Sequence, residues 1–316
     1  MPQPQDPLLI IATNQITIRS HLSLLRKKIM KIEDVPFFTT LVDHMQRSVA
    51  FALEEDIGTG DITAQLIPAE QTVQASIICK DEKAVICGQA WVNEVFRQVD
   101  PSVSLNWLVE DGDNISNQQT LVEVSGNARS ILTAERTALN YLQTLSGTAT
   151  TARQYAEAVK NKNITVLDTR KTIPGLRLAQ KYAVLVGGCA NHRLGLYDMF
   201  LIKENHIAAA GGITKAVAQS QQIAPKAKIE IEVENIEEFN EAAATNAHYI
   251  MLDEFSEQDV EIVIKTDQRA SSHQLEISGG LDLSKVGEHR YEQNIRASVG
   301  GMTKEVRVVD LSLRVL

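Results

Sequence analysis

The chain has 316 residues, of which 44% are hydrophobic, so it can form a full core in one large domain or in two unequal ones. Charged residues make up 22% and both signs are scattered along the sequence, which excludes a long disordered region on composition. The formal net charge of -9 argues against nucleic acid as a general partner, because phosphate backbones are bound mainly by clustered Lys and Arg.

Residues 1 to about 32 precede the first well-patterned helix, and we treat them as an extension of unknown role. Their only apolar run, Leu8 to Ala12, is far shorter than a membrane span. The basic cluster Arg26 to Lys28 follows this run, whereas a secretory signal puts its positive charge first. The chain has three cysteines, an odd number at spacings that match no zinc framework. We therefore expect a cytoplasmic protein with reduced thiols and no membrane segment.

A helix is expected over residues 38 to 55. Its apolar positions recur at helical spacing, and Gly58 and Gly60 follow, where a helix ends and a tight turn begins. The residues expected on its buried face are Leu41, Met45, Val49 and Leu53.

Short apolar or alternating runs from Val73 to Ser125, separated by turn signals, predict a small sheet domain. A long amphipathic helix is expected next, from about Asn127 to Leu145. We place the domain boundary near Gly147, so the first domain spans residues 33 to 146.

After Gly147 the sequence alternates short apolar strands with stretches that favour helix. The strands are ITVL, MFLI, IEIEV, YIML, QLEI and RASV. Repeated β-then-α units imply parallel strands with right-handed crossovers. Charged, polar or glycine residues follow every strand, and in a barrel those ends surround one mouth. With about six units rather than the eight of a complete barrel, an incomplete barrel is favoured, and a doubly wound sheet is the alternative.

Positive charge is concentrated in one part of this acidic chain. Arg matches carboxylate and phosphate bidentately, and Lys adds a compact charge, so a ligand with both kinds of anion would use both. The basic residues are Arg136, Arg170, Lys171, His192, Arg193 and Lys203.

Acidic residues alternate with apolar ones on the IEIEV strand. Glu230, Glu232 and Glu234 therefore share one face of the strand, which in a barrel is the face toward the lumen. With Asp253 at the end of the next strand, these oxygen ligands suit a hard cation such as Mg²⁺.

Two glycine turns follow the last strands, at Ser278 to Gly280 and at Val299 to Gly301. Backbone N–H groups in such turns can bind a phosphate, as they do late in many barrels. Two adjacent glycines alone are usually just a turn, but the two turns together, after consecutive strands, favour a phosphate site.

Eight strings of the sequence, in family order and spacing, resemble the quinolinate phosphoribosyltransferase family. They are EEDIGTGDIT, ERTALNYLQTLSGTAT, LDTRKTIPGLR, GGCANHRLGLYDMFLIKENHI, EIEVEN, MLDEF, EISGG and VGGMTKEV. The similarity extends from about Leu41 to the C-terminus, and the third and fourth strings are long and specific.

The resemblance implies an α/β fold: an N-terminal α/β sandwich domain over residues 33 to 146, and an incomplete (β/α) barrel over residues 147 to 316. The C-terminal tail is expected to pack back on the first domain. The resemblance also implies a homodimer with shared active sites, and it leaves open a larger assembly.

Matching positions imply roles at the quinolinate end of the site. Arg136 would reach into the partner's site, and Lys171 and Lys203 would act where quinolinate meets phosphoribosyl pyrophosphate. The residues implied to bind quinolinate within one subunit are Thr169, Arg170, His192 and Arg193.

At the phosphoribosyl pyrophosphate end, Glu232 and Asp253 would bind the ribose hydroxyls and Mg²⁺. With Lys171 and Lys203, they are the residues implied to act in catalysis. The groups implied to bind phosphate are Ser278, Gly279, Gly280, Gly300, Gly301 and Lys304.

Three features depart from the family pattern. Cys189 stands where glycine is usual, GEHRYEQNIRAS replaces the usual approach to the last strand, and the extension over residues 1 to 32 has no counterpart. None of these removes a charged residue implied to form the site.

The reaction implied is an Mg²⁺-dependent, decarboxylating pentosyl transfer in NAD synthesis. It would convert quinolinate and phosphoribosyl pyrophosphate to nicotinate mononucleotide, pyrophosphate and carbon dioxide. Three alternatives remain at this point: a related transferase with another acceptor, a Schiff-base lyase that uses Lys203, and a non-catalytic binding protein. The arginines at 136, 170 and 193 favour a dicarboxylate acceptor.

Overall fold

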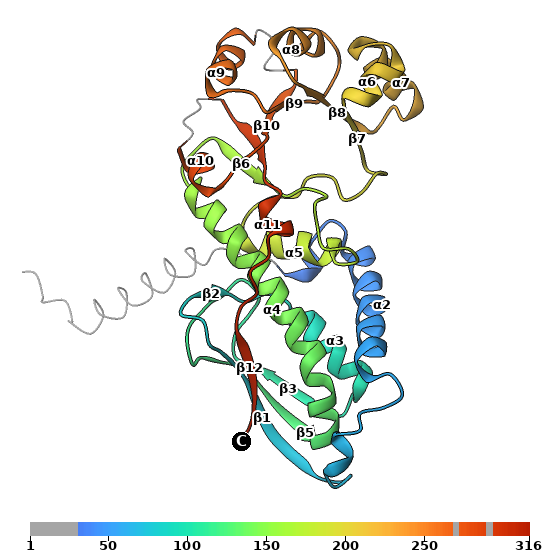
Figure 1. Ribbon diagram of the computed structural model, residues 1–316, viewed down its shortest axis with the longest axis vertical. Coiled ribbons are helices and arrows are strands. Elements are labelled where there is room, and N and C mark those ends of the chain that lie inside the picture. Colours follow the sequence, from blue (N-terminus) through green and yellow to red (C-terminus); the bar gives the residue numbers. More distant parts are fainter. Residues whose placement is uncertain (1–30, 268–271, 289–292) are drawn as a thin grey trace, which may run out of the picture.

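The computed structural model describes residues 31–267, 272–288 and 293–316. The expected extension therefore lies almost wholly outside the described residues, as does part of the GEHRYEQNIRAS string. Figure 1 shows an elongated molecule, with antiparallel strands at one end and a curved ring of parallel strands at the other. Over the described ranges, no helix is both long and apolar enough to cross a bilayer.

The first expected helix is confirmed as α2 (Phe38–Ile57). It buries Leu41, Met45, Val49 and Leu53, and it ends at Gly58, which has a φ of 52°. Short 3-10 turns precede and follow it at Ile32–Asp34 and Ala64–Leu66. The interpretation of residues 73–125 as sheet alone missed α3 (Gln89–Val99), which packs against α2 and α4.

The antiparallel sheet has the strand order β12-β1-β5-β3. Its strands are β1 (Thr72–Cys79), β3 (Ser104–Trp107), β5 (Thr120–Asn127) and β12 (Leu311–Val315). A separate pair joins β2 (Ala84–Val85) to β4 (Asn114–Ile115). Because β12 pairs with β1 from Ala75↔Val315 to Cys79↔Leu311, the C-terminal segment completes the N-terminal sheet. Helices α2, α3 and α4 lie on one side of this sheet, which gives an α/β sandwich (Figure 1).

Helix α4 (Ala128–Ala158) begins as expected but ends later than expected. The Asn127 side chain caps it by accepting hydrogen bonds from two backbone N–H groups of the first turn. The prediction of an end near Leu145 was wrong, because Gly147 does not break the helix. It instead allows close approach of the C-terminal segment, since a Cβ there would lie 2.2 Å from the carbonyl oxygen of Arg307.

Six parallel strands form the second sheet, and all six were expected from the sequence. They are β6 (Ile164–Leu167), β7 (Met199–Ile202), β8 (Lys228–Val233), β9 (Tyr249–Asp253), β10 (Gln274–Ser278) and β11 (Ile295–Ser298). Their order is β6-β11-β10-β9-β8-β7, so the chain adds neighbours in one direction from β7 to β11 without the reversal of a doubly wound sheet. The edges β6 and β7 leave the ring open, which confirms the incomplete barrel.

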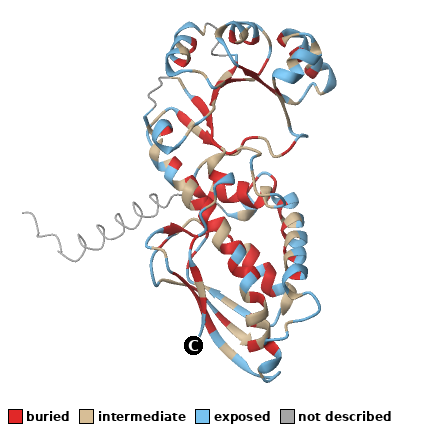
Figure 2. Cartoon of the chain, viewed as in Figure 1, coloured by how far each residue is buried: buried red, intermediate tan, exposed pale blue. Residues whose placement is uncertain are grey.

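Helices follow the strands of this sheet. They are α5 (Arg177–Gly187), α6 (Glu204–Ala210), α7 (Ile213–Ile223), α8 (Ile236–Ala243), α9 (Glu257–Thr266), α10 (Leu283–Glu288) and α11 (Gly301–Lys304). Buried apolar side chains form two clusters, one in the sandwich and one in the barrel, and α4 and α5 contribute to both. Figure 2 shows buried residues in both parts of the molecule. The expected domain boundary therefore falls within a continuous helix, and its exact place stays a prediction.

The contact between α4 and α5 generates a stability prediction. A Cβ on Gly187 would lie 2.4 Å from the Cβ of Ala152 and 2.7 Å from the carbonyl oxygen of Ala149. Gly187→Ala should therefore push the helices apart and lower the free energy of unfolding by about 1–3 kcal/mol, measured by chemical denaturation. Gly287→Ala is the matched control, because a Cβ there meets nothing nearer than 3.9 Å. Equal stability of the two variants would contradict this account.

Candidate active site

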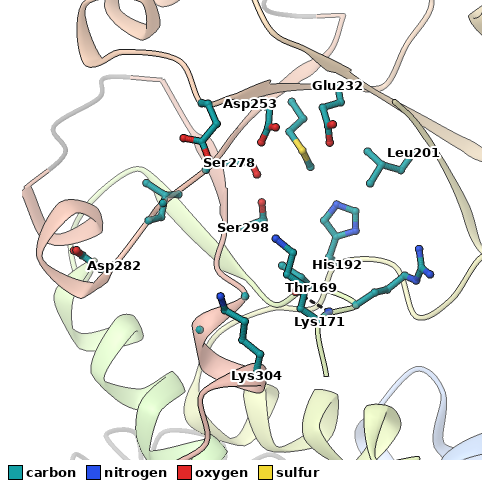
Figure 3. Close-up of a pocket in the computed structure, with 18 of the residues that line it drawn as sticks. Thr169, Lys171, His192, Leu201, Glu232, Asp253, Ser278, Asp282, Ser298 and Lys304 are labelled. Carbon is teal, nitrogen blue, oxygen red and sulfur yellow. Dashed lines mark hydrogen bonds between the residues drawn. The ribbon is translucent and has the colours of Figure 1, made fainter. Parts of the chain in front are cut away.

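A cavity of about 700 Å³ opens at the carboxyl ends of the barrel strands (Figure 3). Of the residues that the resemblance implied for the site, only Arg136 does not line it. Those that do are Thr169, Arg170, Lys171, His192, Arg193, Lys203, Glu232, Asp253, Ser278, Gly279, Gly280, Gly300, Gly301 and Lys304. The cavity therefore brings together the ends of all six strands.

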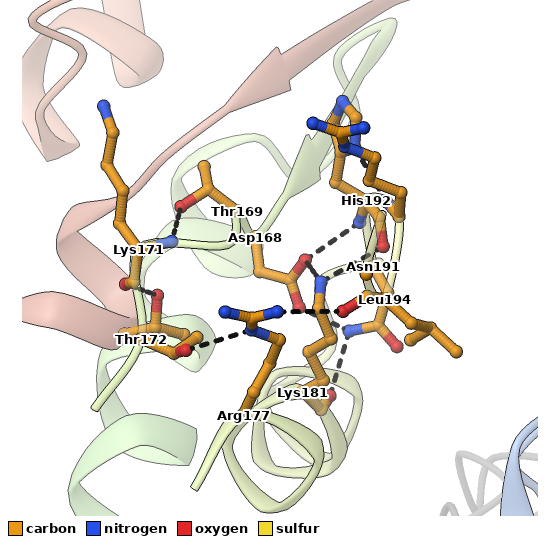
Figure 4. A network of polar contacts seen from close by, with 12 residues as sticks. Asp168, Thr169, Lys171, Thr172, Arg177, Lys181, Asn191, His192 and Leu194 are labelled. Carbon is orange, nitrogen blue, oxygen red and sulfur yellow. Dashed lines mark hydrogen bonds and ion pairs between the residues drawn. The ribbon is translucent and has the colours of Figure 1, made fainter. Parts of the chain in front are cut away.

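A buried carboxylate ties two loops of the cavity together (Figure 4). Asp168 accepts hydrogen bonds from the ammonium of Lys181, from the His192 N–H at 2.9 Å and from the Asn191 side chain at 2.6 Å. Lys181 also donates to the carbonyl oxygen of His192 at 3.1 Å. Asp168 and Lys181 are both fully buried. The strand-end segment 169–171 and the segment 190–193 thus have fixed relative positions.

Burial favours the neutral form of both Asp168 and Lys181. It raises the pKa of Asp168 and lowers the pKa of Lys181, because the charged forms lose their hydration. Their mutual contact opposes both shifts. The main-chain N–H of His192 and the amide of Asn191 further stabilise the carboxylate, so the pair is an ion pair with additional hydrogen bonds.

Neighbouring residues of α5 extend this support. Gln180 accepts a hydrogen bond from the Ile173 N–H at 2.8 Å and donates to the Thr303 carbonyl at 2.8 Å. Tyr182 donates to Asp111 in the sandwich at 2.8 Å. Three consecutive residues of one helix therefore fix the loop after β6, the turn after β11 and the N-terminal domain.

Two guanidinium groups lie on one side of the cavity with few protein partners. The Nε atom of Arg170 is buried, and among the described residues it has no hydrogen-bond partner. Arg193 donates to the carbonyl oxygen of Met199 at 3.2 Å. Burial and the neighbouring Arg170 lower the pKa of Arg193, which reflects two like charges held close together. This arrangement favours an anionic ligand.

His192 lines the cavity, but both of its ring nitrogens contact the protein. Nε2 lies 2.8 Å from a carboxylate oxygen of Glu230 and 3.4 Å from one of Glu276. Nδ1 lies 2.7 Å from the backbone nitrogen of Arg193, whose N–H points to it. Burial lowers the pKa of His192, but the two carboxylates raise it more strongly, to about 9. Direct binding of a substrate carboxylate by His192 stays a prediction.

The three glutamates of the IEIEV strand do not act as one cluster. Glu232 lines the cavity, Glu230 is fully buried below it, and Glu234 is exposed beyond the end of the strand. Glu232 forms an ion pair with Lys203. Burial raises the pKa of Glu232, Lys203 opposes that shift, and the nearby Asp253 carboxylate adds to it. Only Glu232 and Asp253 of the expected acids are therefore available at the mouth (Figure 3).

The two glycine turns close the cavity at the side of β10 and β11. Gly279 and Gly280 have φ values of 100° and 53°, which few other residues adopt. A Cβ on Gly279 would also lie 2.6 Å from the carboxyl carbon of Glu254. At Gly300 a Cβ would lie 3.1 Å from the Lys171 side chain. Both turns thus leave backbone exposed to the cavity where a side chain would fill it.

Sequence reasoning missed several residues that line or support the cavity. The additional lining residues are Tyr155, Leu201, Met251, Glu254, Leu281, Asp282, Ser298 and Glu305. Ser298 ends a strand and could have been found by the strand-end rule. Tyr155 and Lys181 lie within helices, where no local sequence signal distinguishes a site residue from a surface or core residue.

Arg136 is exposed on the first half of α4, on the part of the helix that packs against the sandwich. The structure does not bring it to the cavity of its own chain. Cys189 is half-buried and donates from its thiol to the Ala152 carbonyl at 3.2 Å, so it packs against α4.

Comparisons with known proteins agree with this geometry. The family model described as Quinolinate phosphoribosyl transferase, N-terminal domain, matches residues 61–146. The model for the C-terminal domain of the same family matches residues 148–314.

Individual relatives match most of the chain. A probable nicotinate-nucleotide pyrophosphorylase [carboxylating] from Bacillus subtilis is 38% identical over 262 residues, which cover 83% of this chain and 90% of the relative. Its counterpart from Synechocystis is 40% identical over 236 residues, covering 74% and 80%. The structure of the nicotinate-nucleotide pyrophosphorylase from Francisella tularensis is similar with a TM-score of 0.82 and 42% identity, covering 91% of this chain and 99% of that one.

The ion pair at the base of the two loops generates a second prediction. Lys181→Met removes the ammonium and leaves Asp168 buried with an uncompensated charge, so the free energy of unfolding should fall by about 3–5 kcal/mol. Adding Asp168→Asn removes that charge, and the double variant should recover part of the loss. Chemical denaturation of both single variants and the double variant gives the coupling. Strict additivity would show that the pair is not coupled.

Proposed function

The chain belongs to the quinolinate phosphoribosyltransferase family, and we infer from this membership that it converts quinolinate and phosphoribosyl pyrophosphate to nicotinate mononucleotide, pyrophosphate and carbon dioxide. This is an enzymatic step of NAD biosynthesis.

The observation that carries the proposal is the paired guanidinium groups of Arg170 and Arg193. They lie side by side in the cavity, and the buried Nε of Arg170 lacks a partner among the described residues. Two adjacent carboxylates, as in quinolinate, would supply the acceptors that this pair lacks. A monoacid would leave part of this donor capacity unused.

At the opposite end, the glycine turns offer backbone N–H groups to the phosphates of phosphoribosyl pyrophosphate. Lys171 and Lys304 extend into the cavity on that side (Figure 3). With quinolinate at the arginines, its ring nitrogen would face the anomeric carbon of the ribose. Bond formation at that carbon releases pyrophosphate, and the ammonium groups stabilise the charge on the leaving group.

The sugar develops positive charge as the bond to pyrophosphate breaks. Glu232 lies at the mouth, where its carboxylate would stabilise that charge. Once the ring nitrogen carries the ribose it is cationic, so loss of the adjacent carboxylate as carbon dioxide leaves a carbanion stabilised by the ring. Protonation then gives nicotinate mononucleotide.

We propose that Glu232 and Asp253 hold Mg²⁺. Both offer hard oxygen ligands, and the Asp253 carboxylate has no ion-pair or hydrogen-bond partner in the described ranges. Burial is the main cause that raises the pKa of Glu232, and the nearby Asp253 carboxylate adds to it, a repulsion that a divalent cation would relieve. When bound, Mg²⁺ would supply additional positive charge to the pyrophosphate.

The lyase alternative is disfavoured by the ion pair of Lys203. Imine formation needs a neutral amine with a free lone pair. The Nζ atom of Lys203 instead contacts the carboxylate of Glu232, so it is already engaged by a protein group. The phosphate-binding turns and the acids at the mouth would also have no role in a lyase.

We propose a homodimer with shared sites, since Arg136 is exposed and distant from its own cavity in the chain's topology. A third arginine from a partner would complete the positive end of the site. We also propose a cytoplasmic location, which is supported by the unpaired state of Cys79, Cys87 and Cys189.

Release of labelled carbon dioxide from carboxyl-labelled quinolinate tests the reaction. Purified protein should release label only when phosphoribosyl pyrophosphate and Mg²⁺ are both present, because decarboxylation follows alkylation of the ring nitrogen. Release that needs phosphoribosyl pyrophosphate but not Mg²⁺ would reject the metal assignment. An absence of release under every condition would reject quinolinate as the acceptor.

The shared site predicts complementation between two inactive variants. Arg136→Ala and Arg193→Ala should each lower activity strongly, because each removes a guanidinium from every site of its homodimer. After subunit exchange, hybrid dimers contain one intact site, so mixing should restore about a quarter of wild-type activity at equal concentrations if dimers form at random. Mixing each variant with itself is the control. An exchanged mixture that gains no activity would reject the shared site.

A further inference from the structure

Four ionisable side chains meet inside the barrel beneath the cavity: His192, Glu230, Glu276 and Arg296. Both glutamates are fully buried, and His192 and Arg296 are exposed by only 7% and 8%. His192 Nε2 lies 2.8 Å from Glu230 and 3.4 Å from Glu276. On the other side, Arg296 Nε lies 3.0 Å from Glu276. We call these four residues the buried charge cluster.

The cluster forms a layer directly below the residues that line the cavity. Side chains two positions apart on a strand face the same side, so each cluster strand carries one residue in each layer. The lower and upper residues are Glu230 and Glu232 on β8, Glu276 and Ser278 on β10, and Arg296 and Ser298 on β11. Only the upper residue of each pair lines the cavity.

Two carboxylates in such a place need compensating positive charge, because burying an unpaired charge is very costly. Arg296 supplies one cation, and it is held in place by stacking over the ring of Tyr249 at 3.9 Å. The second cation within reach is the imidazolium of His192. Burial opposes that charge, but the contacts with Glu230 and Glu276 outweigh burial and raise the pKa of His192 to about 9.

One contact favours the neutral form of His192 instead. The backbone N–H of Arg193 points to Nδ1 at 2.7 Å, which suits a ring nitrogen with a free lone pair. Two carboxylates near Nε2 act more strongly than one backbone dipole. The other charged groups around His192 are Asp168 and Lys181, which contact its main chain, and Arg170 and Arg193 beside it in the cavity wall.

We propose that Glu230 and Glu276 are positioning residues that hold His192 as a fixed cation in the wall of the active site. The inference rests on the proposed function. The Nε2 edge of the ring has no exposed surface, so His192 contributes positive charge to the quinolinate end while Arg170 and Arg193 supply the directional hydrogen bonds. Quinolinate is a dianion, and a third fixed cation selects for it over a monoacid.

A bound metal is the competing interpretation of the same groups. The ligand atoms of His192, Glu230 and Glu276 all lie within 4.8 Å of one another, the one such group found among the described residues. Arg296 already pairs with Glu276, however, and places a guanidinium beside the position that a metal would take. With imidazolium and guanidinium opposite two carboxylates, the cluster is neutral without a metal.

Glu276→Gln tests the proposal, because it removes a charge and keeps the shape of the side chain. With one carboxylate lost, the pKa of His192 should fall by about one unit, so the alkaline limb of kcat/KM for quinolinate should move to lower pH. Above that limb, quinolinate should bind about tenfold more weakly than to wild type. The KM for phosphoribosyl pyrophosphate should stay unchanged. Glu230→Gln should act in the same direction and is the second variant if the first does not fold.

The matched control is Glu261→Gln on α9, which removes a carboxylate from the exposed outer surface of the barrel. An NMR titration of the His192 ring, assigned with a His192→Gln variant, reports its ionisation without any need for turnover. This separates failure of the inference from failure of the proposed function. The inference is overturned by a folded Glu276→Gln protein with an unshifted His192 titration or by equal weakening of both substrates. It is also overturned by stoichiometric metal in the wild-type protein that Glu276→Gln removes, because that metal would be held by His192, Glu230 and Glu276.

Discussion

The buried ion pair between Asp168 and Lys181 is the contact on which the geometry of the cavity depends. Its carboxylate accepts hydrogen bonds from Lys181, Asn191 and the His192 backbone, and so joins the segment after β6 to the segment before β7. These strands are the two open edges of the sheet and do not pair with each other. At the gap of an incomplete barrel, these charge-assisted hydrogen bonds thus reinforce the backbone hydrogen bonds that join Ala190 to Val166 and Asp168.

Side chains two positions apart on a strand face the same side, and this repeat sets where the charged groups of β8, β10 and β11 lie. Along β8, β10 and β11 it places one residue at the mouth and one below it, so acids close in sequence have different functions. Glu232 faces the cavity, while Glu230 faces His192. Glu232 therefore lies above a layer whose charges balance one another, and Arg170 and Arg193 at the mouth keep donors for an anionic substrate.

The polarity of the cavity follows from this division. Arg170 and Arg193 concentrate positive charge at one end, and Glu232 and Asp253 place negative charge where a sugar would lose its leaving group. An acidic chain can bind two anionic substrates because its basic residues converge at one edge of the sheet rather than being spread over the surface.

The sequence by itself determined the six strands, the helix α2 and the residues at the strand ends, because periodicity and turn residues are local signals and parallel strands must end at one mouth. It did not determine the presence of α3, the length of α4 or the burial of Glu230 below the cavity, since these depend on packing between distant segments. Lys181 is the clearest case: within its helix it has no distinguishing signal. Only the tertiary structure decided its function, because burial against Asp168, thirteen residues away in sequence, turns an ordinary helical lysine into the support of the site.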